Sequence, residues 1–241
     1  MLLEDKTAVI YGGGGSIGGA VARAFGREGA RVFLAGRTRA TLEGVAEEIR
    51  VAGGTAETAE VDALDEQAVD THADAVASEA GGIDVSFNLI THPYAHGTPL
   101  AEMTLEDFMP PIVTAASTMF VTSRAAARHM IKQGSGVILV FGGSGDPLRD
   151  YYLGGTQVAF DAMESMRRQL SAELEPHGVR VVTLRTGRDA RRRRQRGGLR
   201  GLRPCSHHDR GHGQHQLRRA GRLSSKSPRD PRARSYPVGA A

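Results

Sequence analysis

A glycine-rich stretch near the start of the chain has the residue types and spacing of a phosphate-binding turn. Residues 12–18 read GGGGSIG and lie between an apolar segment, residues 7–10, and a helix-forming one, residues 20–25. The start of a helix attracts a pyrophosphate through its free N–H groups and partial positive charge, and glycines let the backbone approach the ligand. The alternative is a flexible turn without a ligand. The residues that we expect to contact a dinucleotide here are Gly12, Gly14, Gly15, Ser16, Ile17 and Gly18.

The residue after the second predicted strand bears on the choice of cofactor. Residues 30–36 predict a strand that ends just before Arg37. An acidic residue at this place would bind a ribose 2′-hydroxyl, whereas a cation suits a 2′-phosphate. Arg37 therefore favours NADP(H), with NAD(H) as the alternative cofactor. Arg39 is expected to be a solvated charge at the start of the next helix.

A carboxylate follows the third predicted strand, residues 56–61. Asp62 and the adjacent Ala63 lie where a carboxylate can meet the adenine amino group. Asp62 could instead cap the next helix, although Asp65 is the stronger candidate for that cap. We include Asp62 and Ala63 in the predicted cofactor site.

Strands and helices alternate throughout the first three quarters of the chain. This alternation predicts an α/β fold with a Rossmann-type, doubly wound parallel sheet in three αβα layers. Pro110-Pro111 could break the longest helix. Beyond the strands already named, the segments that we expect to be regular are helices 41–52, 66–80, 105–133 and 157–174 and strands 83–90, 137–141 and 179–184.

The charge of the chain is divided unevenly between two parts. Residues 188–241 hold fifteen arginines and Lys226 against three aspartates, a net charge of +13, so that residues 1–187 carry −9 of the overall +4. The second part has almost no apolar periodicity and cannot bury a core. We therefore predict a nucleotide-binding domain over residues 1–187 and an arginine-rich tail over 188–241.

Composition limits the cellular setting. The single cysteine, Cys205, excludes an internal disulfide and fits a reducing compartment. No apolar run approaches the length of a membrane span, and the first residues do not read as a signal peptide. We expect a cytoplasmic protein that does not bind a membrane.

Residues 4–187 resemble the short-chain dehydrogenase/reductase family. The resemblance rests on the glycine loop, Gly36-Arg37, Asp62, Asn88 and the stretch AELEPHGVRV at 172–181. It implies a Rossmann fold, NAD(P)(H) binding with Asn88 at the cofactor site, and reversible hydride transfer between an alcohol and a carbonyl in a small-molecule substrate. It also implies a homodimer or homotetramer that pairs through helices near 105–133 and 155–174.

The sequence departs from the family where the chemistry is expected. The middle glycine of the family's loop is Ser16, and the family's Asn-Asn-Ala-Gly motif keeps only Asn88. The four residues of the family's catalytic set, which are asparagine, serine, tyrosine and lysine, fall on Ala115 or Thr114, Gly143, Thr156 and Phe160.

A proton carrier must therefore come from elsewhere if the chain is an enzyme, because hydride transfer to a carbonyl needs a proton donor. Tyr151 or Tyr152 could reach the site from their loop, with Ser144 as the partner of the substrate oxygen. His92 or His96 could supply the proton near neutral pH. Alternatively the chain binds nucleotide without catalysis and acts through a partner.

The tail admits two interpretations. It is consistent with a shifted reading frame, because moving the frame by one base permits a family-like terminal strand between Asp209 and Leu223. Taken as native, it would be a basic arm for nucleic acid, although Tyr236 is its only aromatic residue for stacking on bases. Nucleic acid is the less favoured partner. The spacing of Cys205 and the tail histidines matches no compact zinc pattern, and we predict no metal site.

Overall fold

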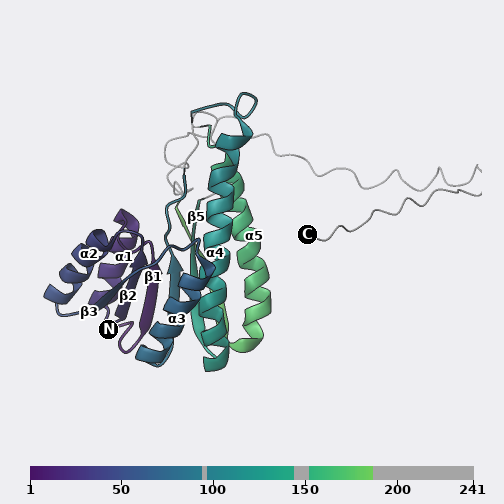
Figure 1. Ribbon diagram of the computed structural model, residues 1–241. Helices are drawn as coiled ribbons and strands as arrows, with labels where there is room; N and C mark the ends of the chain where they lie inside the picture. Colours follow the sequence, from purple (N-terminus) through teal and green to yellow (C-terminus); the bar gives the residue numbers. More distant parts are fainter. Residues whose placement is uncertain (94–96, 144–151, 187–241) are drawn as a thin grey trace, which may run out of the picture. The chain divides into compact units, whose positions relative to one another are not determined.

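The computed structural model describes residues 1–93, 97–143 and 152–186. These residues form alternating strands and helices, as the sequence predicts (Figure 1). Among them, no helix combines the length and apolar character that crossing a membrane requires. The predicted boundary at residue 187 coincides with the end of the described residues, so the two-part division stays a prediction.

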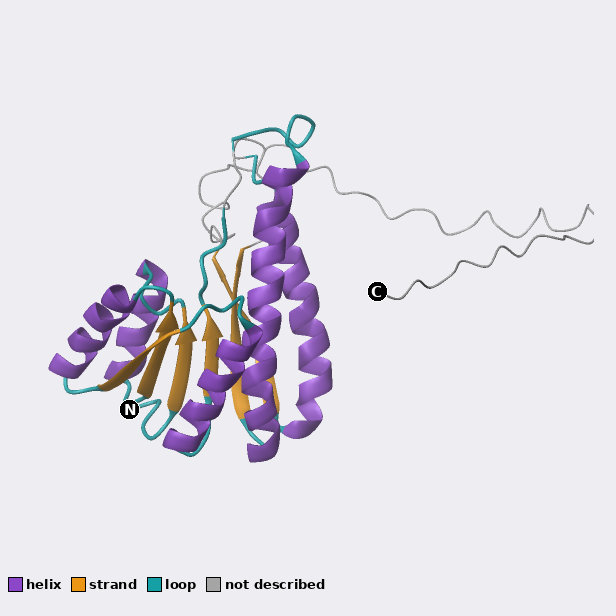
Figure 2. Ribbon diagram, in the orientation of Figure 1, coloured by secondary structure: helices purple, strands orange, loops and turns teal. Residues whose placement is uncertain are grey.

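Six parallel strands form one sheet in the order β3-β2-β1-β4-β5-β6 (Figure 2). The order reverses between β1 and β4, and ligands of open α/β sheets bind in the crevice beyond the carboxyl ends of the strands at such a point. The strands are β1 (Thr7–Tyr11), β2 (Arg31–Gly36), β3 (Thr55–Glu60), β4 (Val85–Asn88), β5 (Gly136–Gly143) and β6 (Val179–Thr186). The Rossmann-type fold is confirmed.

Helices pack on both faces of the sheet because successive residues of its central strands are apolar and point to opposite faces. Val9 and Tyr11 of β1 face the core beneath α3, α4 and α5, whereas Ala8 and Ile10 face the core beneath α1 and α2. The two faces therefore have separate apolar cores. The helices are α1 (Ser16–Arg27), α2 (Arg39–Val51), α3 (Glu66–Ala80), α4 (Leu105–Gln133) and α5 (Gly155–Leu174).

The longest helix, α4, is continuous through Pro110 and Pro111, so the break that these prolines could cause does not occur. Both prolines lie in the first two turns after the Thr104 cap, whose hydroxyl accepts a hydrogen bond from the Asp107 amide at 3.1 Å. Only carbonyls near the exposed start of the helix lose their N–H donors, and water can satisfy these. α4 therefore extends to the level of the site without a kink forced by its prolines.

β6 forms one edge of the sheet that the structure describes. Val179 and Val181 face the core beneath α5, but Val182 and Leu184, on the opposite face, are 41% and 46% exposed. The sheet is thus covered less completely at β6 than at β1, where all five residues are buried.

Candidate functional site

The turn between β1 and α1 has a shape that depends on glycine at two positions. Gly12 has φ +81°, and a Cβ there would lie 2.5 Å from the carbonyl oxygen of Leu89. A Cβ at Gly18 would collide with the carbonyl oxygen of Gly12. The Gly12 amide donates to Ala35 at 2.8 Å, which joins the turn to β2. The turn therefore lies close to β2 and β4, with no side chains between the backbones.

Ser16, which replaces the family's middle glycine, is compatible with this turn. It is the first residue of α1, and it is absent from the two described non-glycine residues with positive φ, Asp5 and Tyr152. Its side chain is exposed, so the serine neither strains the backbone nor displaces a packed neighbour. The serine at this position therefore leaves the shape of the glycine turn, residues 12–18, intact; this turn is called the cradle below.

The N-terminus of α1 is open to an anion. Gly15 occupies the cap position without a side-chain hydrogen bond, and no acidic residue lies in the first turn. The free amide groups and the positive end of the helix dipole therefore lie beside a cavity that Ser16 and Ile17 line, without a competing carboxylate in the first turn. This arrangement is suited to a phosphate group.

A cleft with a volume of about 510 Å³ lies beyond the carboxyl ends of β1, β2 and β3. The glycine turn forms one wall, and Thr114 and Thr118 of α4 contribute to another. Arg37 is exposed at the end of β2, and Arg39 begins α2 as an exposed charge, as predicted. Six of the predicted cofactor residues line this cleft, namely Gly12, Gly14, Gly15, Arg37, Asp62 and Ala63.

Asp62 has a local structural role in addition to its place in the cleft. Its Oδ1 accepts a hydrogen bond from the Leu64 amide at 3.0 Å. The cap of α3 is Asp65, whose carboxylate accepts from the Ala68 amide at 3.0 Å, as the sequence predicts. Asp62 therefore holds the turn after β3, and its exposed carboxylate still faces the cleft.

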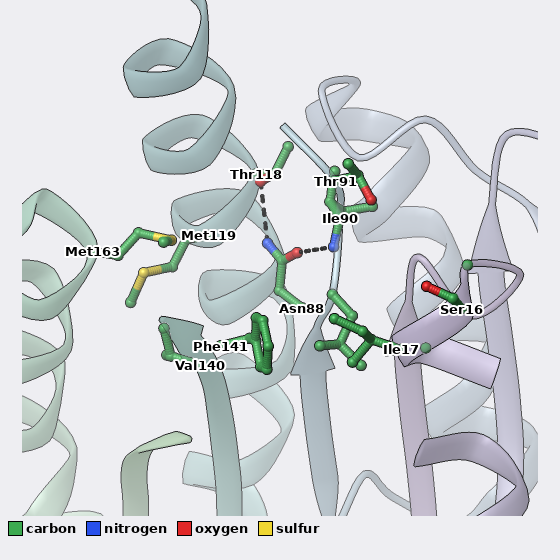
Figure 3. A pocket seen from close by; sticks show the side chains of 13 residues that line it. Ser16, Ile17, Asn88, Ile90, Thr91, Thr118, Met119, Val140, Phe141 and Met163 are labelled. Atoms are coloured by element: carbon green, nitrogen blue, oxygen red, sulfur yellow. Dashed lines mark hydrogen bonds between the residues drawn. The ribbon is translucent and has the colours of Figure 1, made fainter. Parts of the chain in front are cut away.

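The other predicted cofactor residues line a small adjoining cavity of about 80 Å³ (Figure 3). Ser16, Ile17 and Gly18 come from α1, and Asn88 comes from the end of β4. The Asn88 side chain donates to the Thr118 hydroxyl at 3.2 Å and accepts from the Ile90 amide at 2.9 Å. Asn88 therefore fixes the path of the chain where it leaves β4.

Thr118 is a site residue that the sequence analysis missed. It lines both cavities, and Thr122, one turn later, also accepts from Asn88, at 3.4 Å. A signal was present, because Thr114, Thr118 and Thr122 recur every four residues and therefore share one face of α4.

The positions of the family's catalytic residues carry no ionisable side chain, although Gly143 and Phe160 line a cavity of about 200 Å³ together with charged residues such as Glu164. Phe160 covers Gly143, where a Cβ would lie 2.6 Å from the Phe160 ring. Thr156 is only 1% exposed, and its hydroxyl has no hydrogen-bond partner among the residues that the structure describes. None of these three side chains can carry a proton at neutral pH.

The structure places only part of the predicted catalytic set. Ser144, Tyr151 and the alternative His96 lie outside the described residues. Tyr152 is 46% exposed and has φ +44°. His92, in contrast, is 8% exposed and lines the cleft. Within the described ranges, no group of three histidine, cysteine or acidic residues could hold a metal ion.

The chain is similar in sequence to known proteins. The sequence pattern of the short chain dehydrogenase family matches residues 6–189. Uncharacterized oxidoreductase YxbG of Bacillus subtilis is 29% identical over 185 residues, which are 77% of this chain and 67% of that protein. D-threitol dehydrogenase of Mycolicibacterium smegmatis is 27% identical over 183 residues, 76% of this chain and 69% of that one.

The chain is also similar to a solved structure. The crystal structure of a metagenomic short-chain oxidoreductase in complex with NADP is 28% identical, with a TM-score of 0.70, over 78% of this chain and 85% of that chain. The fold and the cleft define a Rossmann-type nucleotide-binding protein. The chain belongs to the short-chain dehydrogenase family, as its sequence motifs predict.

Proposed function

We propose that the chain is an NAD(P)-dependent oxidoreductase that interconverts an alcohol and a carbonyl in a small molecule, with NADP(H) preferred. The glycine turn at the start of α1 carries the proposal, because a Cβ at Gly12 or Gly18 would collide with the backbone of Leu89 or Gly12 and force the turn from the path that brings the uncapped helix start to the cleft. Family membership supports hydride transfer as the reaction, and the NADP complex of a relative supports the cofactor class.

The residues of the cleft fit such a cofactor. The amides at the start of α1 would hold the pyrophosphate, and Arg37 would pair with a 2′-phosphate. Asp62 and Ala63 would contact the adenine, and Asn88 would hold the backbone that faces the nicotinamide half. When bound, the cofactor would supply the hydride acceptor or donor, and the chain must supply the path for the proton.

The proton path and the assembly remain proposals. The loop residues Ser144, Tyr151 and Tyr152 are the predicted carriers by position. A homodimer or homotetramer through α4 and α5 is consistent with exposed apolar side chains on these helices, including Phe120 and Val158, which are 49% and 43% exposed. A cytoplasmic location also stays a prediction.

The first test is a fluorescence titration of the purified chain with NADPH and NADH, together with Arg37→Ala. We expect Arg37→Ala to weaken NADPH binding about 10- to 100-fold, because a charge-assisted contact to phosphate contributes about 1.5–3 kcal/mol. NADH binding should change less than about twofold. Arg39→Ala is the matched control and should leave both affinities unchanged. Equal losses for both cofactors in Arg37→Ala would contradict the preference for NADP(H).

A second candidate function is nucleotide binding without catalysis, with action through a partner. The specific observation in its favour is that Gly143, Thr156 and Phe160, at the positions of the family's serine, tyrosine and lysine, offer no ionisable side chain. A panel of carbonyls with NADPH, and of polyols and other secondary alcohols with NADP⁺, separates the two functions. Tight NADPH binding without turnover of any compound would favour the non-catalytic function.

A further inference from the structure

His92 lies at the edge of the cleft and contacts Phe160, which occupies the position of the family's lysine. It follows β4 by four residues, and it lines the same cavity as Gly12, Gly15 and Thr118. Its side chain is almost enclosed, at 8% exposure. It is therefore a buried titratable group at the edge of a cleft otherwise lined there by apolar and hydroxyl side chains.

The Phe160 ring connects His92 to the family's catalytic positions. The His92 and Phe160 rings meet edge to face, with 5.8 Å between their centroids. The same Phe160 ring covers Gly143. Three segments distant in sequence thus meet at this point, and two of them carry the positions of the family's lysine and serine. His92 is the member of this group that can gain or lose a proton near neutral pH.

We propose that His92 is the proton carrier of this enzyme and takes up the alcohol proton when a secondary alcohol is oxidised. The inference rests on the proposed function and names the residue that completes its chemistry. Tyr152, which is 46% exposed, is the alternative carrier that the test below separates from His92.

Oxidation of the alcohol transfers one proton to His92 and one hydride to the cofactor. The unprotonated imidazole nitrogen of His92 accepts the hydroxyl proton, the substrate C–O bond becomes C=O, and the hydride leaves the same carbon for NADP⁺, the oxidant. The imidazolium then releases its proton to water through the cleft. In the reverse direction, protonated His92 donates to the forming alkoxide.

The surroundings of His92 favour the neutral imidazole, which is the form that accepts a proton. Burial lowers the pKa of His92 below its ordinary value, so that the ring is mostly neutral at pH 7. A neutral ring accepts a proton without prior deprotonation, which suits alcohol oxidation. Phe160 strengthens the effect because its apolar ring keeps water from one edge of the imidazole.

The test uses the full chain and two substitutions at His92. Glutamine keeps much of the volume and polarity of histidine but cannot take up a proton, so we expect His92→Gln to lower kcat at least about 100-fold with the Kd for NADPH within about twofold. In His92→Ala, added imidazole should restore part of kcat, which a structural role would not produce. His177→Asn is the matched control, an exposed histidine remote in sequence, and should leave kcat unchanged.

Each other result decides against the proposal. A folded His92→Gln variant with kcat within about threefold of the parent would overturn it, as would a large loss in Tyr152→Phe with none in His92→Gln. If His92→Gln does not fold, a lack of imidazole rescue in His92→Ala overturns the role. If the wild-type protein binds NADPH but oxidises no alcohol, the catalytic role of His92 is overturned, whereas the proposed cofactor site is retained. Loss of NADPH binding in the parent would instead remove the proposed function itself.

Discussion

The two halves of the sheet differ in what they retain of the family's design. In the half with β1, β2 and β3, β1 and nearly all of β2 are buried, the edge strand β3 is partly exposed, and the nine predicted cofactor residues of this half line a cavity. In the half with β4, β5 and β6, the edge strand is partly exposed, and the positions of the catalytic residues hold Gly143, Thr156 and Phe160.

This difference has a physical cause. Cofactor binding relies mainly on the backbone, through a glycine turn, helix amides and the carboxyl ends of strands. Catalysis relies on particular side chains, and a single substitution removes a proton carrier. A chain can therefore keep a complete nucleotide cradle while its chemistry is lost or transferred to another residue. Substitutions in the two halves of the sheet can test this separation.

The cradle should be the most sensitive part of the molecule. Gly18→Ala places a Cβ against the Gly12 carbonyl oxygen, so the turn must shift away from its ligand-binding path. We expect NADPH affinity to fall at least about 100-fold, equivalent to about 2.7 kcal/mol, in a fluorescence titration. Gly44→Ala is the control, because nothing lies within 4 Å of a Cβ there. Unchanged affinity in a folded Gly18→Ala variant would contradict the cradle.

Glu164 should stabilise the half of the sheet that contains β4, β5 and β6. Its carboxylate accepts from Arg167 at 2.9 Å and from Thr183 at 2.7 Å, and it pairs with Arg185 at 3.2 Å. It thus connects α5 to the edge strand β6. Glu164→Gln should lower the free energy of unfolding at pH 7 by about 1–2 kcal/mol, measured by denaturant unfolding. Asp161→Asn, an exposed acid on the same helix, should have little effect.

The effect of Glu164 should depend on pH in a defined direction. Hydrogen bonds, first from Arg167, lower the pKa of Glu164 from its ordinary value near 4.5 to about 2. The unfolded chain therefore takes up the proton first as the pH falls, and the stabilisation present above pH 4.5 is lost toward pH 2. The difference between parent and Glu164→Gln should shrink over this range. A constant difference would show that charge is not the cause.

The smallest effect is expected at Thr156, and it has the opposite sign. Its buried hydroxyl has no hydrogen-bond partner among the described residues, so Thr156→Val should raise the free energy of unfolding by about 1 kcal/mol without changing kcat. Thr118→Val should instead lower stability, because it removes a partner of Asn88. A tenfold fall in kcat for Thr156→Val would place Thr156 in the proton path and contradict the separation of the two halves.

The basic tail keeps its two interpretations as predictions, because residues 187–241 lie outside the described part of the chain. Sequencing the gene through codon 187 tests the shifted frame: a single frame that encodes the arginine-rich residues without an alternative would exclude it. If the tail is native, deleting residues 188–241 should abolish any affinity for nucleic acid, as measured at several salt concentrations.

The order of the elements and the glycine turn after β1 can be predicted from the sequence alone. Strand and helix patterns are local, with apolar residues at fixed spacing and Gly12 at a turn that needs positive φ, so they can be read without the fold. The bounds of α4, residues 105–133, were predicted correctly. The effect of its two prolines was left open, because the cost of a proline depends on which carbonyls lose their donors.

Which side chains meet His92 depends on the packing of the whole domain and cannot be predicted from the sequence. His92, Gly143 and Phe160 come from three segments that the chain separates by many residues, and their contact depends on how β4, β5 and α5 pack. The pairing of Asn88 with Thr118 likewise depends on where α4 crosses the end of β4. Burial of His92, which favours its neutral form, is a property of that packing and has no local signal in the sequence.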